Sequence, residues 1–188
     1  NERVAILAMF IAIKEGLADE DLKIVLKSAI YHDIGRKTNE KNHGKASADL
    51  LLEHKDEIAP EFDAVDLNVV RFLCESHTID DREKSVLDKN MLEKYSLVES
   101  PTLVKMTKIL KDADALDRVR LTRFGKIDTD YLRTDSAKEM VQIAKDLFTE
   151  YRNIQYDLGT ISNTSIFDIQ NDNIIEDENN YYVFRTLN

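Results

Sequence analysis

Two adjacent residues, His32 and Asp33, have side chains that can bind a metal ion. They stand at the end of an apolar segment with helical spacing, and the run continues with isoleucine, glycine and arginine. An imidazole and a carboxylate placed side by side can both reach one divalent cation, and both are common ligands of such ions. A His-Asp pair also occurs by chance, so its interpretation as a metal site depends on the other polar residues.

Asp114 is a second candidate ligand, because it interrupts the apolar face of a helix predicted to begin at Ser100. A 4,3,4,3,4 spacing, which places residues on one stripe of a helix, is followed by Leu103, Thr107, Leu110, Asp114, Asp117 and Leu121. An ionised carboxylate that faces the interior is unstable unless it is paired or bound to a metal ion. Asp114 therefore needs a partner, and an arginine and a metal ion are both open as that partner.

Two histidines at predicted helix ends extend the candidate set. His43 begins a helix directly after the polar loop that follows the doublet, and His77 ends another helix directly before a charged loop. A single histidine on a helix is usually structural or exposed, but ligands at helix ends can converge on one cleft. We therefore include His43 and His77 as candidate metal ligands.

Other polar residues are predicted to lie outside such a site. Asp112 shares a helix face with Lys105 and Lys108, which is typical of a solvated surface. His54 follows His43 by 11 residues, so on one continuous helix the two lie ~16 Å apart and cannot bind the same ion.

The elements that must position these residues are predicted to be helices. The 188 residues include only two prolines and five glycines, and 43% are hydrophobic, which favours one core built from helices. Apolar periodicity predicts helices over 2–14, from 19 into the doublet, and over 43–55, 63–77, 100–121 and 136–153, with capping residues at Gly16, Asp19, Asp63, Ser100 and Ser136. The stretches 35–42, 78–84 and 122–134 are predicted to be irregular. The predicted fold class is all-α.

The composition changes after Gly159, which predicts a helical domain over residues 1–158 and a C-terminal tail over 159–188. The tail is rich in asparagine, aspartate and β-branched or aromatic residues. Residues 173–184 are compatible with a small β-hairpin across Glu178 and Asn179, and equally with an irregular, partly ordered tail.

Charge and cysteine content exclude several classes of protein. A net charge of −10 argues against an extended nucleic-acid surface and against attraction to an anionic membrane. No apolar run approaches the ~20 residues of a membrane span, and no secretory pattern opens the sequence. The single cysteine, Cys74, lies in an apolar helical pattern and is predicted to be a buried structural thiol. We expect a cytoplasmic protein.

The order of these residues resembles the HD-domain metal-dependent phosphohydrolases, an all-helical superfamily with the pattern His…His-Asp…Asp. His32-Asp33 matches the signature doublet and Asp114 the distal aspartate, over about residues 1–150. His43 and His77 look like the two extra histidines of members that hold a second metal ion. The resemblance implies an HD-domain-like helical bundle.

One ligand of that family is expected outside the sequence. In relatives a histidine on the first helix usually lies three residues before an Arg-Val pair, which here is Arg3-Val4. The histidine is therefore expected just before Asn1, with the first helix truncated and the sequence a piece of a longer chain. A homo-oligomer is also open.

The resemblance implies hydrolysis of a phosphate ester by metal-activated water. Imidazole and carboxylate ligands suit one or two ions of Mn²⁺, Fe²⁺, Co²⁺, Ni²⁺, Zn²⁺ or Mg²⁺. Asp33 is expected to bind metal and to accept a proton from water, and Arg36 to act beside it in catalysis. Arg36, Lys37 and Arg118 are the candidate phosphate-binding residues, each of which can equally be a surface charge.

Three functions are open from the sequence. The first is a metal-dependent phosphohydrolase acting on a small phosphate ester, most simply a nucleotide phosphomonoester or phosphodiester. The second is a non-catalytic module with the same fold that binds a nucleotide or metal and regulates a neighbouring domain. The third is a helical interaction domain in which the motif is accidental.

Overall fold

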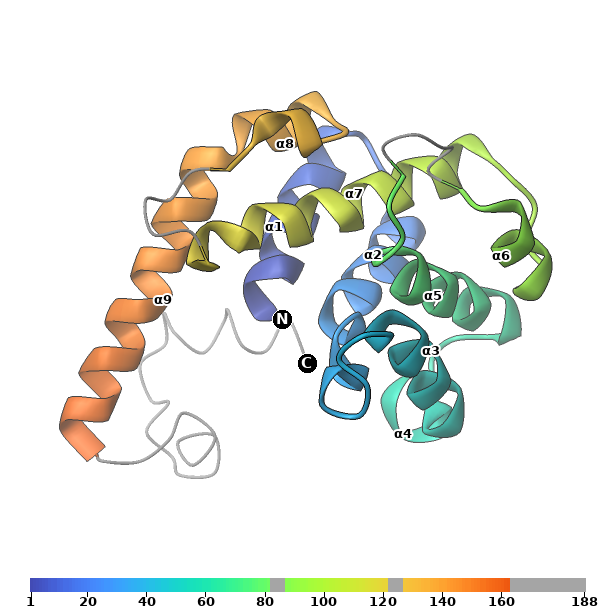
Figure 1. Cartoon of the computed structure of the whole chain (residues 1–188), viewed down its shortest axis with the longest axis horizontal. Coiled ribbons are helices and arrows are strands. Elements are labelled where there is room, and N and C mark those ends of the chain that lie inside the picture. Colours follow the sequence, from blue (N-terminus) through green and yellow to red (C-terminus); the bar gives the residue numbers. More distant parts are fainter. Residues whose placement is uncertain (82–86, 122–126, 163–188) are drawn as a thin grey trace. The chain divides into compact units, whose positions relative to one another are not determined.

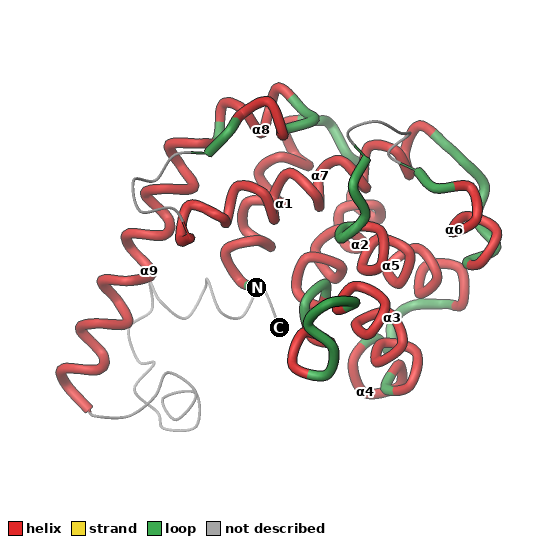
Figure 2. The backbone as a smooth tube through the Cα atoms, viewed as in Figure 1, coloured by secondary structure: helices red, strands yellow, loops and turns green. Residues whose placement is uncertain are grey.

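The computed structural model describes residues 1–81, 87–121 and 127–162. These residues form helices and loops without a strand, so the all-α prediction is confirmed (Figures 1 and 2). The α-helices are α1 (Glu2–Lys14), α2 (Asp19–Tyr31), α3 (His43–Glu53), α4 (Lys55–Ile58), α5 (Ala64–Ser76), α6 (Lys89–Lys94), α7 (Pro101–Asp117), α8 (Asp135–Glu139) and α9 (Val141–Ser162). Short 3-10 helices are η1 (Ile34–Lys37), η2 (Arg118–Leu121) and η3 (Thr129–Tyr131).

Helix α7 lies at the centre of the packing, in contact with α1, α2 and α5. Helix α3 packs against α5 and η1, and α2 contacts α1 and α5. The apolar faces that meet there are fully buried, among them Leu7, Ile11, Val25, Leu51, Phe72, Leu73, Ile109, Leu110 and Leu116. Burial of such side chains is the main stabilising contribution to a helical domain, and it fixes the helix ends that carry the candidate ligands.

Several helix ends were correctly predicted because capping is local. The Asp63 carboxylate accepts hydrogen bonds from the amides of Val65 and Asp66, and the Ser100 hydroxyl accepts one from Leu103. Gly16 follows α1 with a positive φ of 66°, a conformation that glycine adopts without strain. These caps determine where α5 and α7 begin.

Two predicted caps are wrong. Asp19 is the first residue of α2, and the capping position is occupied by Ala18. Thr134, and not Ser136, caps α8 through its hydroxyl, because Ser136 instead donates a hydrogen bond to Glu15. The helix predicted over 136–153 is two helices that separate at Met140.

Helix α7 ends at Asp117, earlier than the apolar stripe suggested. Leu121 therefore lies on η2, where it is 66% exposed, and its predicted place on the buried stripe is wrong. Helix α6, which the sequence did not predict, is six residues long and is capped by Asp88. Part of the predicted loop 35–42 forms η1.

The chain divides into two compact units, residues 1–144 and 145–188. The first contains α1 to α8 and every candidate site residue. In the second, the described part is the remainder of α9, which ends at Ser162. The predicted hairpin over 173–184 lies outside the described residues, and the domain boundary at 158 stays a prediction. Within the described residues no helix has the length and apolar character needed to cross a membrane.

Candidate metal centre

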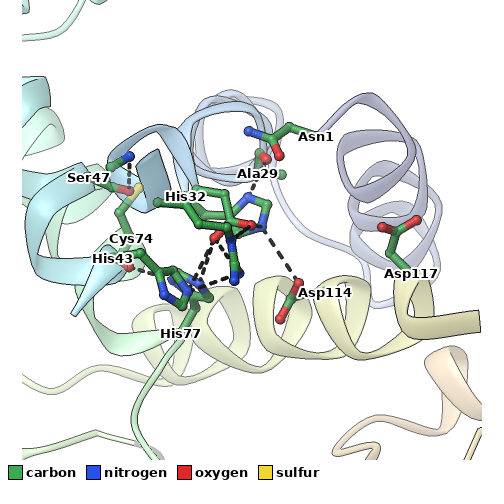
Figure 3. A network of polar contacts seen from close by, with 12 residues as sticks. Asn1, Ala29, His32, His43, Ser47, Cys74, His77, Asp114 and Asp117 are labelled. Carbon is green, nitrogen blue, oxygen red and sulfur yellow. Dashed lines mark hydrogen bonds and ion pairs between the residues drawn. The ribbon is translucent and has the colours of Figure 1, made fainter. Parts of the chain in front are cut away.

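Four helices bring the candidate ligands together (Figure 3). His32 is the C-cap of α2 and Asp33 follows it. His43 is the first residue of α3, and His77 is the C-cap of α5. Asp114 lies in the last turns of α7. We call these five residues the histidine centre.

Two glycines allow the backbones at this centre to approach closely. A Cβ atom on Gly35 would lie 2.4 Å from the Ser47 amide nitrogen, and one on Gly44 would lie 2.8 Å from the Cys74 carbonyl oxygen. Both distances are too short for a side chain, so η1 and the start of α3 can pack as they do only with glycine. The Gly35 amide also donates a hydrogen bond to Ser47 Oγ at 3.0 Å. This close packing fixes the positions of Asp33, His43 and His77 relative to one another.

The three histidines share one orientation. Each places Nδ1 near the backbone carbonyl three residues earlier: His32 at 2.7 Å from Ala29, His43 at 2.8 Å from Glu40, and His77 at 2.6 Å from Cys74. A carbonyl can only accept, so Nδ1 carries the proton in each ring and Nε2 is left with its lone pair. Metal-binding histidines are typically oriented by such a bond from the other ring nitrogen.

The three Nε2 atoms face the two carboxylates. His32 Nε2 lies 3.7 Å from Asp33 Oδ2 and 3.7 Å from Asp114 Oδ1. The other oxygen of Asp33, Oδ1, lies 3.3 Å from His43 Nε2 and 3.6 Å from His77 Nε2. The two oxygens of Asp33 thus face two groups of ligand atoms. We call the group of His32, Asp114 and Asp33 Oδ2 the first subsite, and the group of His43, His77 and Asp33 Oδ1 the second subsite.

These separations are compatible with bound ions. Ligand atoms ~2.1 Å from one octahedral ion lie ~3.0 Å apart when adjacent and ~4.2 Å apart when opposite. The distances of 3.3 to 3.7 Å in the histidine centre fall between these limits. His32, Asp33 and His77 also form a cluster whose ligand atoms all lie within 4.8 Å of one another. The residues therefore fit a divalent metal ion.

The contacts of His77 give the strongest indication that this site binds a ligand. The His77 side chain is 2% exposed, and Nε2 is a buried polar atom without a hydrogen-bond partner among the described residues. Such an atom is costly unless something binds it. Burial lowers the pKa of His77, which keeps the ring neutral and able to bind a cation.

Both carboxylates are held in the ionised form. Burial acts to raise the pKa of Asp33, but contacts with His77, Arg36 and His32 outweigh it and leave the pKa well below the usual range. Burial likewise acts to raise the pKa of Asp114, and the contact with His32 and the charges around it lower the pKa overall. Deprotonated carboxylates and neutral imidazoles are the forms that bind metal ions.

The three predicted phosphate-binding residues differ in their positions. Arg36 contacts the centre directly, since Nε and Nη2 donate to the two oxygens of Asp33 at 2.9 and 3.0 Å. Arg118 lies at the rim: it is 67% exposed, and Nη2 is 3.9 Å from Asp114 Oδ2. Lys37 is exposed on η1.

Within the described residues, Asp114 is not paired with a buried arginine, which was the alternative to metal binding. Its nearest basic partners are His32 at 3.7 Å and the exposed Arg118. Asp117, which shares the predicted stripe, lies away from the histidines (Figure 3) and binds Arg3 and Arg120 instead. His54 is also outside the centre, as predicted.

The prediction that Asp112 is solvated is wrong. Its side chain is fully buried and accepts hydrogen bonds from the amides of Arg133 and Thr134, the Thr134 hydroxyl and the Arg133 guanidinium. Asp81 binds the same guanidinium, and Lys111 donates to the Ile79 carbonyl at 2.6 Å. We call Asp81, Lys111, Asp112, Arg133 and Thr134 the Asp112 network. Sequence reasoning missed it because its members come from three separate segments.

Cys74 is a structural residue, as predicted. It is fully buried, and Sγ donates to the Ser28 carbonyl at 3.7 Å. Burial raises the pKa of the thiol far above its usual range, which keeps it protonated and unreactive. Its carbonyl oxygen contributes to the site by accepting the His77 Nδ1 hydrogen bond.

Comparison with known proteins gives one match. The family model for the HD domain matches residues 2–119, a range that includes all five residues of the histidine centre. No curated protein and no solved structure matches the chain. Because the matched range covers more than half of the sequence, the chain belongs to the HD domain family, within the superfamily of HD metal-dependent phosphohydrolases.

Proposed function

We propose that this protein hydrolyses a small phosphate ester in a metal-dependent reaction, with a nucleotide phosphomonoester or phosphodiester as substrate. The observation that carries the proposal is the convergence of three oriented imidazoles and two ionised carboxylates around Asp33, with a buried His77 Nε2 that has no hydrogen-bond partner in the described part of the chain. Membership in the HD domain family supports the same reaction class.

Each subsite has a ligand set suited to a borderline or hard cation. His32, Asp114 and one oxygen of Asp33 would hold a first ion, and His43, His77 and the other oxygen of Asp33 would hold a second. A bound divalent ion supplies a Lewis acid that makes water more acidic and polarises a phosphoryl oxygen.

The protein's own residues supply the remaining functions. Asp33 contacts both subsites, so its carboxylate is well placed to accept a proton from the attacking water. Arg36 contacts Asp33 and Arg118 lies near Asp114, and a guanidinium binds phosphate oxygens through paired N–H donors. Lys37 adds a positive charge next to Arg36.

The test begins with metal analysis of the purified protein, followed by a screen of nucleotide monoesters and diesters with added Mn²⁺ or Mg²⁺. Bound metal and turnover are expected. Asp33→Ala should abolish turnover and leave the far-ultraviolet circular dichroism spectrum unchanged, because Asp33 lies outside the packed core. Asp49→Ala, which removes an exposed carboxylate on α3, is the matched control and should keep full activity.

Two outcomes would contradict the proposal. Full activity of Asp33→Ala would place the reaction elsewhere. Bound metal without turnover of any phosphate ester would instead favour a module that binds its ligand without hydrolysing it.

A further inference from the structure

Arg36 occupies a particular place within the histidine centre. Its Nη2 atom donates to Asp33 Oδ1 at 3.0 Å and lies 3.2 Å from His43 Nε2. Because His43 Nδ1 carries its proton toward Glu40, Nε2 accepts this contact from the guanidinium. One cationic nitrogen therefore lies between two of the three ligand atoms of the second subsite.

The same guanidinium contacts only one ligand atom of the first subsite, since Arg36 Nε donates to Asp33 Oδ2 at 2.9 Å. His32 Nε2 lies 3.7 Å from Asp33 Oδ2 and 3.7 Å from Asp114 Oδ1, and the exposed Arg118 lies 3.9 Å from the other oxygen of Asp114. The two subsites share Asp33 but differ in how many of their ligand atoms the guanidinium contacts, which is two in the second subsite and one in the first.

Charge balance makes this difference important. The centre contains two carboxylates, Asp33 and Asp114, so one divalent ion neutralises it. Arg36 adds a positive charge at hydrogen-bond distance from the second subsite. A second divalent ion would meet both an excess of positive charge and a guanidinium bound to its own ligands. Like charges this close repel strongly in a partly buried site.

A phosphate group changes that balance. It brings negative charge and oxygen acceptors that a guanidinium binds through two parallel hydrogen bonds. Arg36 is 45% exposed in its side chain, so it can turn toward a ligand in the solvent without disturbing the packed core.

We propose that Arg36 keeps the second subsite closed to metal, and that binding of a phosphate group draws Arg36 away from Asp33 and His43 so that the second ion can bind. This inference rests on the proposed function for the identity of the site. Under this proposal Arg36 has two roles. It contacts phosphate, and it couples phosphate binding to the number of bound ions.

The test measures Mn²⁺ binding by equilibrium dialysis and metal analysis, without substrate and without turnover. In the absence of phosphate, the unchanged protein should bind one Mn²⁺ tightly and a second much more weakly. Arg36→Gln should bind the second ion about tenfold more tightly, which lies within the range typical of coupled sites. Arg36→Lys should lie between the two, because an ammonium retains the charge but cannot bind Asp33 and His43 together.

Inorganic phosphate provides the second arm. It should tighten the second Mn²⁺ of the unchanged protein about tenfold, and by reciprocity Mn²⁺ should tighten phosphate to the same degree. In Arg36→Gln the effect of phosphate on the second ion should be largely lost. If phosphate has an equal effect in both proteins, it bridges the ions directly and the role given to Arg36 is wrong.

The chain contains a closely matched control. Arg120 binds Asp117 with the same three-residue spacing and the same 2.9 Å Nε to Oδ2 distance as Arg36 and Asp33, but away from the histidines. Arg120→Gln should leave Mn²⁺ binding unchanged, and His43→Ala should remove the second ion only. Equal affinity of the second ion in Arg36→Gln and in the unchanged protein would overturn the inference, whether or not the protein hydrolyses phosphate esters.

Discussion

Asp112 and Asp114 lie two residues apart on α7, yet their surroundings are opposite. Asp112 accepts hydrogen bonds from two backbone amides, a hydroxyl and a guanidinium, and all its partners belong to the protein. Asp114 has no nitrogen closer than the 3.7 Å of His32 Nε2 among its described ion pairs. The first carboxylate is a structural residue, and the second is available to a ligand.

The comparison shows how similar residues on one helix divide between stability and function. In the Asp112 network the buried charges are fully paired, and such pairs hold loops in place. In the histidine centre, His77 Nε2 has no hydrogen-bond partner among the described residues, and the described ion pairs of Asp114 are no shorter than 3.7 Å. Buried polar groups that are left unpaired mark functional sites, because folding alone gains nothing from them.

Removing the carboxylate at position 114 should have the largest effect on metal binding. Asp114→Asn should weaken the first ion at least ~100-fold, more than the loss of an outer-shell partner of a metal ligand, which costs 10–100-fold. The free energy of unfolding without metal should fall less than in Asp112→Asn, because the described ion pairs of Asp114 are no shorter than 3.7 Å. Titration calorimetry with Mn²⁺ and urea unfolding measure the two quantities. Unchanged Mn²⁺ affinity would remove Asp114 from the centre.

The same substitution two residues earlier should act in the opposite way. Asp112→Asn replaces one accepting oxygen with a donor amide that faces the donors of Arg133 and Thr134, so stability should fall by about 2 kcal/mol. Mn²⁺ affinity should be unchanged. Urea unfolding of both variants, side by side, tests the division between the two carboxylates. Equal losses of stability in Asp112→Asn and Asp114→Asn would show that the two carboxylates do not divide into a structural one and a ligand-binding one.

Local sequence patterns predicted the all-α fold class, several helix caps and the candidate metal ligands. The caps at Asp63 and Ser100 depend on residues two or three positions away, and the doublet and the two histidines at helix ends depend on where helices stop. The structure places these candidate ligands together because α7 packs against both α2 and α5. The sequence alone shows only that each ligand lies at a helix end or on a core face.

The wrong sequence predictions concern contacts and helix boundaries that a local pattern does not contain. Asp112 was predicted to be solvated from its lysine neighbours on the helix, but its partner Arg133 comes from 21 residues further along the chain. Leu121 was placed on a buried stripe by extending periodicity past the last residue of α7. Helix α6 is too short to show a period. In each case the deciding contact or boundary lies outside the local pattern.

Lys111 connects the Asp112 network to the histidine centre. Its substitution should therefore have an effect of intermediate size. Its ammonium donates to the Ile79 carbonyl, so it ties the segment that follows His77 to the helix that carries Asp114. Lys111→Met keeps the length and apolar volume of the side chain but loses this bond. Mn²⁺ affinity should fall roughly tenfold, as for other residues that position a ligand.

Stability should also fall in the same variant, because Lys111→Met removes a cation 3.7 Å from the buried Asp81 carboxylate and the donor to the Ile79 carbonyl. Urea unfolding and Mn²⁺ titration of Lys111→Met separate the two effects. A large stability loss with unchanged Mn²⁺ affinity would confine Lys111 to the structural network and break its link to His77.

The smallest expected effect concerns the contribution of Asp81, in the Asp112 network, to stability in acid. Burial acts to raise the pKa of Asp81, but the hydrogen bonds from Arg133 and the charges of Lys111 and Arg133 lower it overall. A carboxyl group with a lower pKa in the folded state stabilises the fold above its unfolded pKa of ~3.9, and this contribution is lost as the pH falls through the folded value. Asp81→Asn should therefore lower the urea midpoint near pH 6 and give a shallower decline toward pH 3. Since Asp81 does not contact the histidine centre, Mn²⁺ affinity at pH 7 should stay the same; a changed affinity would show that the two regions are less separate than their contacts indicate.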